Sequence, residues 1–193
     1  MARPKEFQRD DVLERAMQVF WSKGFECTSM QDLVDAMGIN RGSLYDTFGG
    51  KRDLHIAAVE RFCELEVPHM FADLDGPGPV KPAIRSLFAE IAEKATHGED
   101  LRGCMISNTA AELCPDSGPT GEIVAAGLKR AEESLHKALV RARDQGEIKA
   151  DSDPLKLARH FVCSLNGMRV VAKGINDPKI LDDMIDGTLS ILD

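Results

Sequence analysis

The sequence contains no long hydrophobic segment and no secretory leader pattern. No run of apolar residues approaches the roughly 18 to 20 that a membrane-spanning helix needs. The start of the chain, MARPKEFQRD, lacks the apolar core of a secretory signal. The proportions of hydrophobic residues, 43%, and charged residues, 29%, are those of an ordinary globular protein. We therefore expect a cytoplasmic protein with no membrane partner.

Cysteine and histidine are few, and neither follows the spacing of a disulfide framework or a metal site. The 5 cysteines are an odd number without repeated spacing, which is typical of reduced thiols. The 5 histidines are scattered and form no pair with a cysteine at ligand spacing. The chain also lacks a phosphate-binding glycine loop, G-x-S-x-G and H-E-x-x-H. We expect no metal, no cofactor and no catalytic residues, and hence a protein that is not an enzyme.

Strand-like alternation and internal repeats are absent as well, whereas helical periodicity is present along the whole chain. Pro68 predicts the end of the fourth helix, and the turn-rich segment Asp73–Pro82 predicts a loop. Asp153-Pro154 and Asp177-Pro178 each combine a helix cap with a proline at the first helical position. The sequence therefore predicts an all-α fold of about nine helices.

The stretch from Thr28 to Phe48 predicts two short helices joined by a tight turn. Thr28 or Ser29 can cap the first helix, and Gly38 can end it with a left-handed backbone. Asn40 can then cap a second helix over residues 41–48. Apolar residues occupy one face of the two helices: Met30, Leu33, Val34, Met37, Leu44 and Phe48.

The second helix leaves polar side chains pointing outward, namely those of Arg41, Ser43, Tyr45 and Thr47. Two short helices with such an outer face are typical of a helix-turn-helix, whose second helix fits the major groove of DNA. A solvated polar face is the alternative interpretation of the same residues.

This stretch and the residues around it resemble the DNA-binding region of the TetR family of transcriptional regulators. The chain meets three parts of the family pattern in order. The first, F-x-x-x-G-[FY]-x-x-T-[ST], is met by Phe20, Gly24, Phe25, Thr28 and Ser29, and the second, A-x-x-x-G-[VI], by Gly38 and Ile39, with Val34 in place of the alanine. The third, G-[ST]-[LF]-Y-x-x-F-x-x-K, is met by Gly42, Ser43, Leu44, Tyr45, Phe48 and Lys51. The chain departs from the family at Asp46 and Thr47, where many relatives carry an aromatic residue and a histidine.

The chemistry of these side chains suggests a role for each in binding double-stranded DNA. The guanidinium of Arg41 matches the two acceptors of guanine. Tyr45 and Lys51 suit phosphates, Lys51 because it lies at a helix start. Asp46 either accepts from a cytosine amine or is a solvated or Arg41-paired acid. The DNA-contacting set that we expect is Thr28, Ser29, Arg41, Gly42, Ser43, Tyr45, Thr47 and Lys51.

The resemblance also implies the organisation of the chain and its partners. Residues 1–50 would form the helix-turn-helix DNA-binding domain, and residues 51–193 a ligand-binding and dimerisation domain. The last two helices would pair with those of a second copy, so that a homodimer binds a palindromic operator. A small-molecule effector would release the DNA, which makes a repressor the expected function. Residues expected to line the effector pocket are Phe88, Cys104, Asn108, Phe161, Asn166 and Met168.

Two alternatives stay open at this stage. Cys104, after Gly103 at an expected helix start, could act as a redox or electrophile sensor, and a metal sensor is a further form of that alternative. A helical interaction protein without DNA binding is the other. Its support is the charge of the head, since residues 1–52 hold 8 Lys/Arg and 8 Asp/Glu, whereas residues 53–193 hold 16 and 24.

Overall fold

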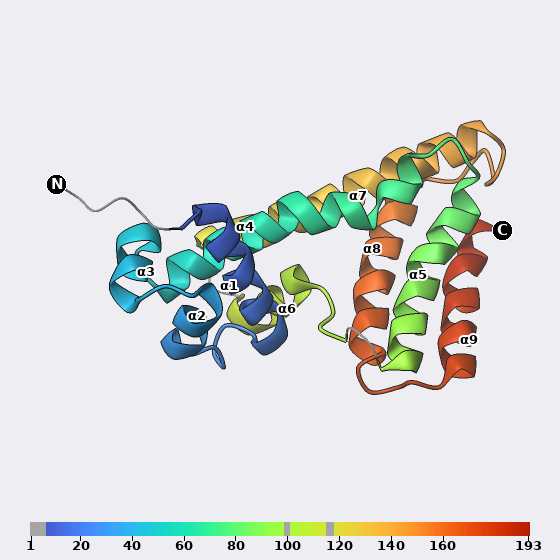
Figure 1. Ribbon diagram of the computed structural model, residues 1–193. Coiled ribbons are helices and arrows are strands. Elements are labelled where there is room, and N and C mark those ends of the chain that lie inside the picture. The colour runs from blue at the N-terminus through green and yellow to red at the C-terminus, as the bar shows by residue number, and fades with distance from the viewer. Residues whose placement is uncertain (1–6, 99–100, 115–117) are drawn as a thin grey trace. The chain divides into compact units, whose positions relative to one another are not determined.

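The computed structural model describes residues 7–98, 101–114 and 118–193, and within them the fold is entirely helical (Figure 1). This confirms the all-α prediction, including its number of helices. The described residues form nine α-helices and two short 3-10 helices: α1 (Arg9–Lys23), α2 (Met30–Met37), α3 (Arg41–Phe48), α4 (Lys51–Met70), η1 (Ala72–Asp75), α5 (Val80–His97), α6 (Met105–Leu113), α7 (Pro119–Asp144), α8 (Pro154–Val171), α9 (Pro178–Leu189) and η2 (Ser190–Leu192). No helix among the described residues is long and apolar enough to cross a membrane.

The chain divides into two compact units. The first consists of residues 1–65 and 105–125, and the second of residues 66–104 and 126–193. The first unit thus contains α1, α2 and α3, most of α4, and also α6, which is far from them in the sequence.

The first unit is built around the apolar face of α1. Phe20 of α1 is buried, as are Leu33 of α2, Leu44 of α3 and Phe62 of α4. Trp21 is half-buried and packs its ring edge against Phe62, with the ring centroids 4.9 Å apart. The short helices α2 and α3 therefore owe their position to packing against longer helices.

The second unit packs α5 between α8 and α9 (Figure 1). Its loops are tied to the helices by polar side chains. The carboxylate of Glu147 accepts hydrogen bonds from the backbone N–H groups of Val80, at 2.8 Å, and Lys81, at 3.1 Å, at the start of α5. Arg141 donates to the carbonyl oxygen of Leu74 at 2.7 Å. These contacts satisfy backbone groups that a helix end and a turn leave unpaired.

Two sequence predictions about the region around α4 and α5 were wrong. Helix α4 does not end before Pro68 but continues to Met70, with the proline inside it. A proline so near a helix end removes one backbone hydrogen bond, and the burial of Val67 and Phe71 offsets that loss. Likewise, α5 begins within the expected loop, at Val80, because proline is tolerated in the first turn of a helix.

The start signals of the last two helices are confirmed. Asp153 caps α8 by accepting from the backbone N–H groups of Leu155, at 3.0 Å, and Lys156, at 3.2 Å. These hydrogen bonds to the ionised form lower the pKa of Asp153. Asp177 caps α9 in the same way, accepting from the N–H of Lys179 at 2.9 Å.

Replacing the Asp153 cap should destabilise the protein without altering its fold. We expect Asp153→Ala to lower the free energy of unfolding, because the backbone N–H groups of Leu155 and Lys156 lose their acceptor and the helix loses its cap. Urea unfolding followed by circular dichroism measures this change. Asp151→Ala is the matched control, because Asp151 is an exposed acid in the same loop outside the cap position. An equal decrease in the free energy of unfolding of the two variants would contradict the capping role of Asp153.

Candidate nucleic-acid interface

Helices α2 and α3 are joined by a turn whose geometry follows directly from its sequence. Ser29 and Asp32 form a reciprocal capping box, in which Ser29 Oγ accepts from the Asp32 N–H at 3.1 Å and an Asp32 carboxylate oxygen accepts from the Ser29 N–H at 2.8 Å. Gly38 ends α2 in the left-handed conformation, with φ of 68°. Asn40 caps α3 by accepting from the Ser43 N–H at 2.8 Å. All three predicted signals are confirmed.

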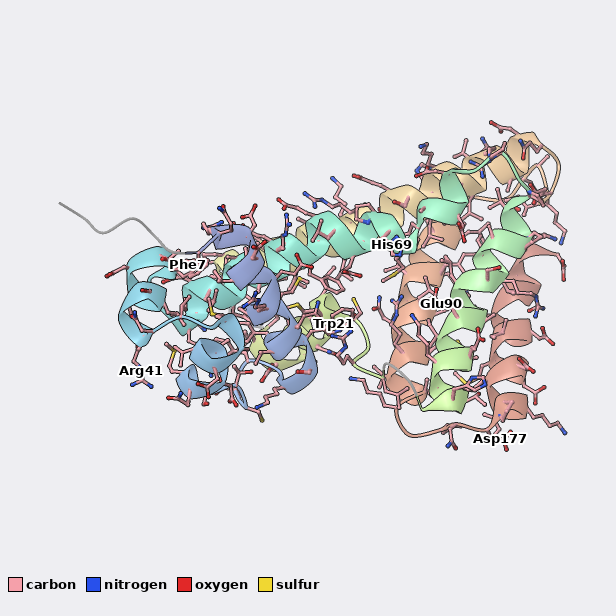
Figure 2. All side chains as sticks on the ribbon, in the orientation of Figure 1. Phe7, Trp21, Arg41, His69, Glu90 and Asp177 are labelled. Carbon is pink, nitrogen blue, oxygen red and sulfur yellow. The ribbon has the colours of Figure 1, made fainter. Side chains whose placement is uncertain are left out.

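The two faces of α3 differ sharply. Leu44 and Phe48 are buried, as predicted. The side chain of Arg41 extends from the helix into the surroundings (Figure 2), and 49% of Tyr45 is exposed. Asp46 is exposed too, and Ser43 is half-buried. The exposed face of α3 thus offers a guanidinium, a phenol and a carboxylate as hydrogen-bonding groups.

Two threonines expected to contact DNA direct their hydroxyl groups inward. Thr28 is only 1% exposed, and its hydroxyl donates to the carbonyl oxygen of Gly24 at 2.6 Å. The hydroxyl oxygen of Thr47 is buried and has no hydrogen-bond partner among the described residues. Both threonines therefore contribute to the packing of the first unit.

The start of α2 already carries an anion. Lys23 donates to the carboxylate of Asp32 at 2.6 Å, and the hydroxyl of Ser29 donates to the same carboxylate at 2.7 Å. These hydrogen bonds, the one from Lys23 first, hold the pKa of Asp32 well below its usual range. Since the ionised carboxylate occupies the helix start, a phosphate at Ser29 would meet a like charge.

Lys51, at the start of α4, lies over the turn between α1 and α2. Its ammonium nitrogen is 4.4 Å from the centroid of the Phe25 ring and 3.5 Å from the carbonyl oxygen of Glu26. An ammonium group has three N–H donors, so the hydrogen bond to Glu26 leaves donors for a phosphate.

Sequence reasoning missed His55, which is buried inside the first unit. Its ring packs edge-on against Phe20 and Phe25, with centroid distances of 4.8 and 5.1 Å. Burial lowers the pKa of His55 to about 4, so the ring is neutral at pH 7. The signal was its spacing, because His55, Val59 and Phe62 fall at i, i+4 and i+7 on the buried face of α4.

The structure does not gather the six expected effector-contacting residues into one unit. Asn108 belongs to α6 in the first unit, and the other five belong to the second. Phe88 and Phe161 are buried with their ring centroids 6.1 Å apart. Cys104 and Met168 are also buried, and the half-buried Asn166 donates to the carbonyl oxygen of Val162 at 2.8 Å.

Arg169 is a further polar residue of the second unit that sequence reasoning missed. Its guanidinium donates to the sulfur of Met70 at 2.8 Å. Burial lowers the pKa of Arg169, while the nearby groups of Cys104 and Glu90 act in the opposite direction. Within the described ranges, no cluster of three His, Cys, Asp or Glu side chains is arranged to hold a metal ion.

Two short helices joined by a glycine turn, with an exposed polar face on the second, define a helix-turn-helix regulator. The sequence profile described as "Bacterial regulatory proteins, tetR family" matches residues 12–58. A second profile, "Tetracyclin repressor-like, C-terminal domain", matches residues 80–187. The chain therefore belongs to the TetR family of bacterial transcriptional regulators.

Individual relatives agree with this assignment. The chain is 39% identical to the uncharacterised HTH-type transcriptional regulator YezE of Bacillus subtilis, over the full length of both proteins. It is 33% identical to the HTH-type transcriptional repressor ComR of Escherichia coli, covering 89% of this chain and 82% of that protein. The solved structure of a cysteine mutant of CifR, a TetR family transcriptional regulator, complexed with 26-bp double-strand operator DNA, superposes with a TM-score of 0.83 at 28% identity and full coverage of both chains.

The buried imidazole of His55 should make the stability of the protein depend on pH. The pKa of histidine is about 6.5 when unfolded and about 4 here, so the unfolded state binds more protons between these values. Stability is therefore complete above pH 6.5 and falls as the pH drops toward 4. Between pH 7 and 5 the contribution of His55 to the loss should be about 2 kcal/mol.

Urea unfolding at the two pH values tests this expectation. His55→Gln, which does not titrate, should lose less stability than the wild type between pH 7 and 5. His69→Gln removes an exposed imidazole from the same helix and is the matched control. An unchanged pH dependence in His55→Gln would show that the buried ring is not the cause.

Proposed function

We propose that this TetR-family regulator is a repressor that binds a palindromic operator as a homodimer and releases it when a small molecule binds the second unit. The observation that carries the proposal is the face of α3. A two-turn helix leaves Arg41 and Tyr45 exposed, while the buried Leu44 and Phe48 fix the helix to the first unit. Such a helix presents hydrogen-bonding groups to base edges in the major groove.

We propose fewer DNA-contacting residues than the sequence alone suggested. Arg41 donates to a guanine, and the outward phenol of Tyr45 donates to a phosphate. Ser43 and Gly42 lie on the same helix, where an added Cβ at Gly42 would come within 3.2 Å of the capping oxygen of Asn40. Lys51 supplies a second phosphate contact from the start of α4. Thr28, Ser29 and Thr47 act by shaping the helix-turn-helix.

Exposed apolar side chains near the C-terminus support a dimer. Val170 of α8 is 63% exposed, and Ile180 of α9 and Ile191 of η2 are 43% and 49% exposed. Single apolar residues at a surface are ordinary, but Val170 and Ile180 lie on the two helices that the resemblance assigns to dimerisation, and Ile191 lies in the short helix that directly follows them. A dimer allows two copies of α3 to engage half-sites about 34–36 Å apart.

The second unit is the proposed place of effector binding. Its buried side chains are largely apolar, with Phe88 and Phe161 in edge-on contact and Met168 buried seven residues further along α8. An effector that binds one conformation of the dimer better than the other would shift the equilibrium away from the DNA-bound form. We propose residues 1–50 as the DNA-binding domain and 51–193 as the effector and dimerisation domain. In this role the protein acts on chromosomal DNA in the cytoplasm and catalyses no reaction.

Substitutions on α3 should weaken operator binding in two distinguishable ways. Arg41→Ala should cost about 1–3 kcal/mol and relax the preference for one base pair, because it removes a base contact. Tyr45→Ala should weaken binding to all sequences alike and leave the salt dependence unchanged, because it removes a contact between a phosphate and a neutral hydroxyl group. Fluorescence anisotropy with duplexes from the DNA upstream of the protein's own gene measures both effects.

The control variant is Lys129→Ala, which removes one exposed positive charge from α7 in the second unit. It should bind operator DNA as the wild type does. If Arg41→Ala and Tyr45→Ala also keep wild-type affinity at low salt, α3 is not the recognition helix.

A charge at the proposed dimer surface should separate the two copies. We expect Val170→Asp to raise the dimer Kd by about 100-fold, because an unpaired carboxylate would become buried between apolar groups. Light scattering coupled to size-exclusion chromatography should report the mass of one chain instead of two. Leu65→Asp, at a residue of α4 that is 38% exposed, is the matched control. A monomeric wild type would contradict the dimer.

A further inference from the structure

A carboxylate from α6 accepts two hydrogen bonds from the turn that precedes the helix-turn-helix. Glu112 accepts a hydrogen bond from the backbone N–H of Phe25 with Oε2, at 2.8 Å, and one from the N–H of Glu26 with Oε1, at 2.7 Å. The residues involved are 86 and 87 positions apart in the sequence. Hydrogen bonds from N–H groups to an ionised carboxylate are about twice as strong as those between neutral groups.

The turn is shaped to admit this carboxylate. Gly24, which precedes the two donating amides, has φ of 78°, a conformation that other residues rarely adopt. A Cβ atom at Gly24 would also lie 2.9 Å from Glu112 Oε2, closer than a side-chain carbon can approach. Both the backbone conformation and the lack of a side chain at Gly24 therefore serve the contact with Glu112.

The remaining faces of the turn are held by other elements of the first unit. Phe25 packs on His55, and Lys51 reaches over the Phe25 ring to the carbonyl oxygen of Glu26. Thr28 closes the turn with its hydrogen bond to Gly24. Helix α2 is capped one residue later, at Ser29, so the conformation of the turn sets where α2 starts.

We propose that Glu112 is a positioning residue for operator recognition: by fixing the turn over residues 24–28, it holds α2 and α3 in the orientation that a specific duplex requires. This inference rests on the proposed DNA-binding function of α3. The positioning role should affect affinity for a specific duplex but not affinity for DNA in general, because base contacts need an accurately oriented helix, whereas attraction to phosphates does not. Glu112 itself touches no DNA in this role.

The negative charge of Glu112 makes the electrostatic effect of its removal opposite in direction to the effect expected from the positioning role. Replacing a glutamate by a neutral residue raises the attraction of the protein to any duplex, because one like charge is removed. A loss of affinity for the specific duplex alone would thus be opposite to the electrostatic effect. The second unit offers a matched control in Glu147, whose carboxylate accepts from the N–H groups of Val80 and Lys81 in the same manner.

The experiment compares Glu112→Ala, Glu112→Gln and Glu147→Ala with the wild type on two probes. One is a duplex that the wild-type protein selects from a random library, and the other is a duplex of scrambled sequence and equal length. We expect Glu112→Ala to raise the Kd for the selected duplex about tenfold, the equivalent of about one hydrogen bond to a charged group, without raising the Kd for the scrambled one. Glu112→Gln should lie between, since its amide oxygen accepts one of the two bonds. Glu147→Ala should retain the wild-type ratio of the two Kd values.

Hydrogen exchange provides a readout at the contact itself. The peptide covering residues 24–28 should exchange faster in Glu112→Ala than in the wild type and in Glu147→Ala. Equal weakening on both duplexes, or wild-type affinity for both, would overturn the role of Glu112. Should Glu112→Ala fail to fold, Glu112→Gln decides between the same outcomes. If the wild type itself selects no duplex, the proposed function fails, and the positioning role fails with it.

Discussion

Helix α3, the proposed recognition helix, is too short to be stable on its own, and this constraint governs the first unit. It has 8 residues, whereas isolated helices below about 12–15 residues are marginal in water. Its stability comes from the Asn40 cap and from the burial of Leu44 and Phe48. Because Leu44 and Phe48 are the only buried residues of this helix, its polar side chains stay at or near the surface. The same packing that makes the helix stable therefore makes it available to DNA.

Polar groups from distant parts of the chain complete what local packing begins. Glu112 supplies acceptors to the turn before α2, and Glu147 supplies them to the start of α5. In each unit, an acid binds backbone N–H groups that the local chain leaves unpaired, which would otherwise be satisfied only by water. Such a contact fixes an orientation as well as adding stability, because two hydrogen bonds to one carboxylate define a direction.

The sequence predicted those features whose cause is local. The caps at Ser29, Asn40, Asp153 and Asp177 and the turn at Gly38 were all found from residue type and spacing. The prediction that α4 ends before Pro68 was wrong, because the residues around the proline bury enough apolar surface to extend the helix. Contacts such as that of Glu112 with Phe25 could not be predicted, since an exposed glutamate on a helix carries no mark of a partner 87 residues away. The inward hydroxyls of Thr28 and Thr47 belong to the same class, because periodicity gives the face of a helix but not the direction of each polar atom.

The balance of charge in residues 1–52 bears on how release from DNA works. Residues 1–52 have equal numbers of basic and acidic residues, and Asp32 neutralises Lys23 at 2.6 Å. Affinity from counterion release grows with the number of phosphates neutralised, so a single copy of this segment, with no excess of basic residues, gains little from it. In the proposed dimer, affinity depends instead on both copies of α3 meeting their half-sites together. An effector then needs to bind one conformation better by only about 1–3 kcal/mol to shift binding substantially, because losing the register of one copy removes the benefit of the other.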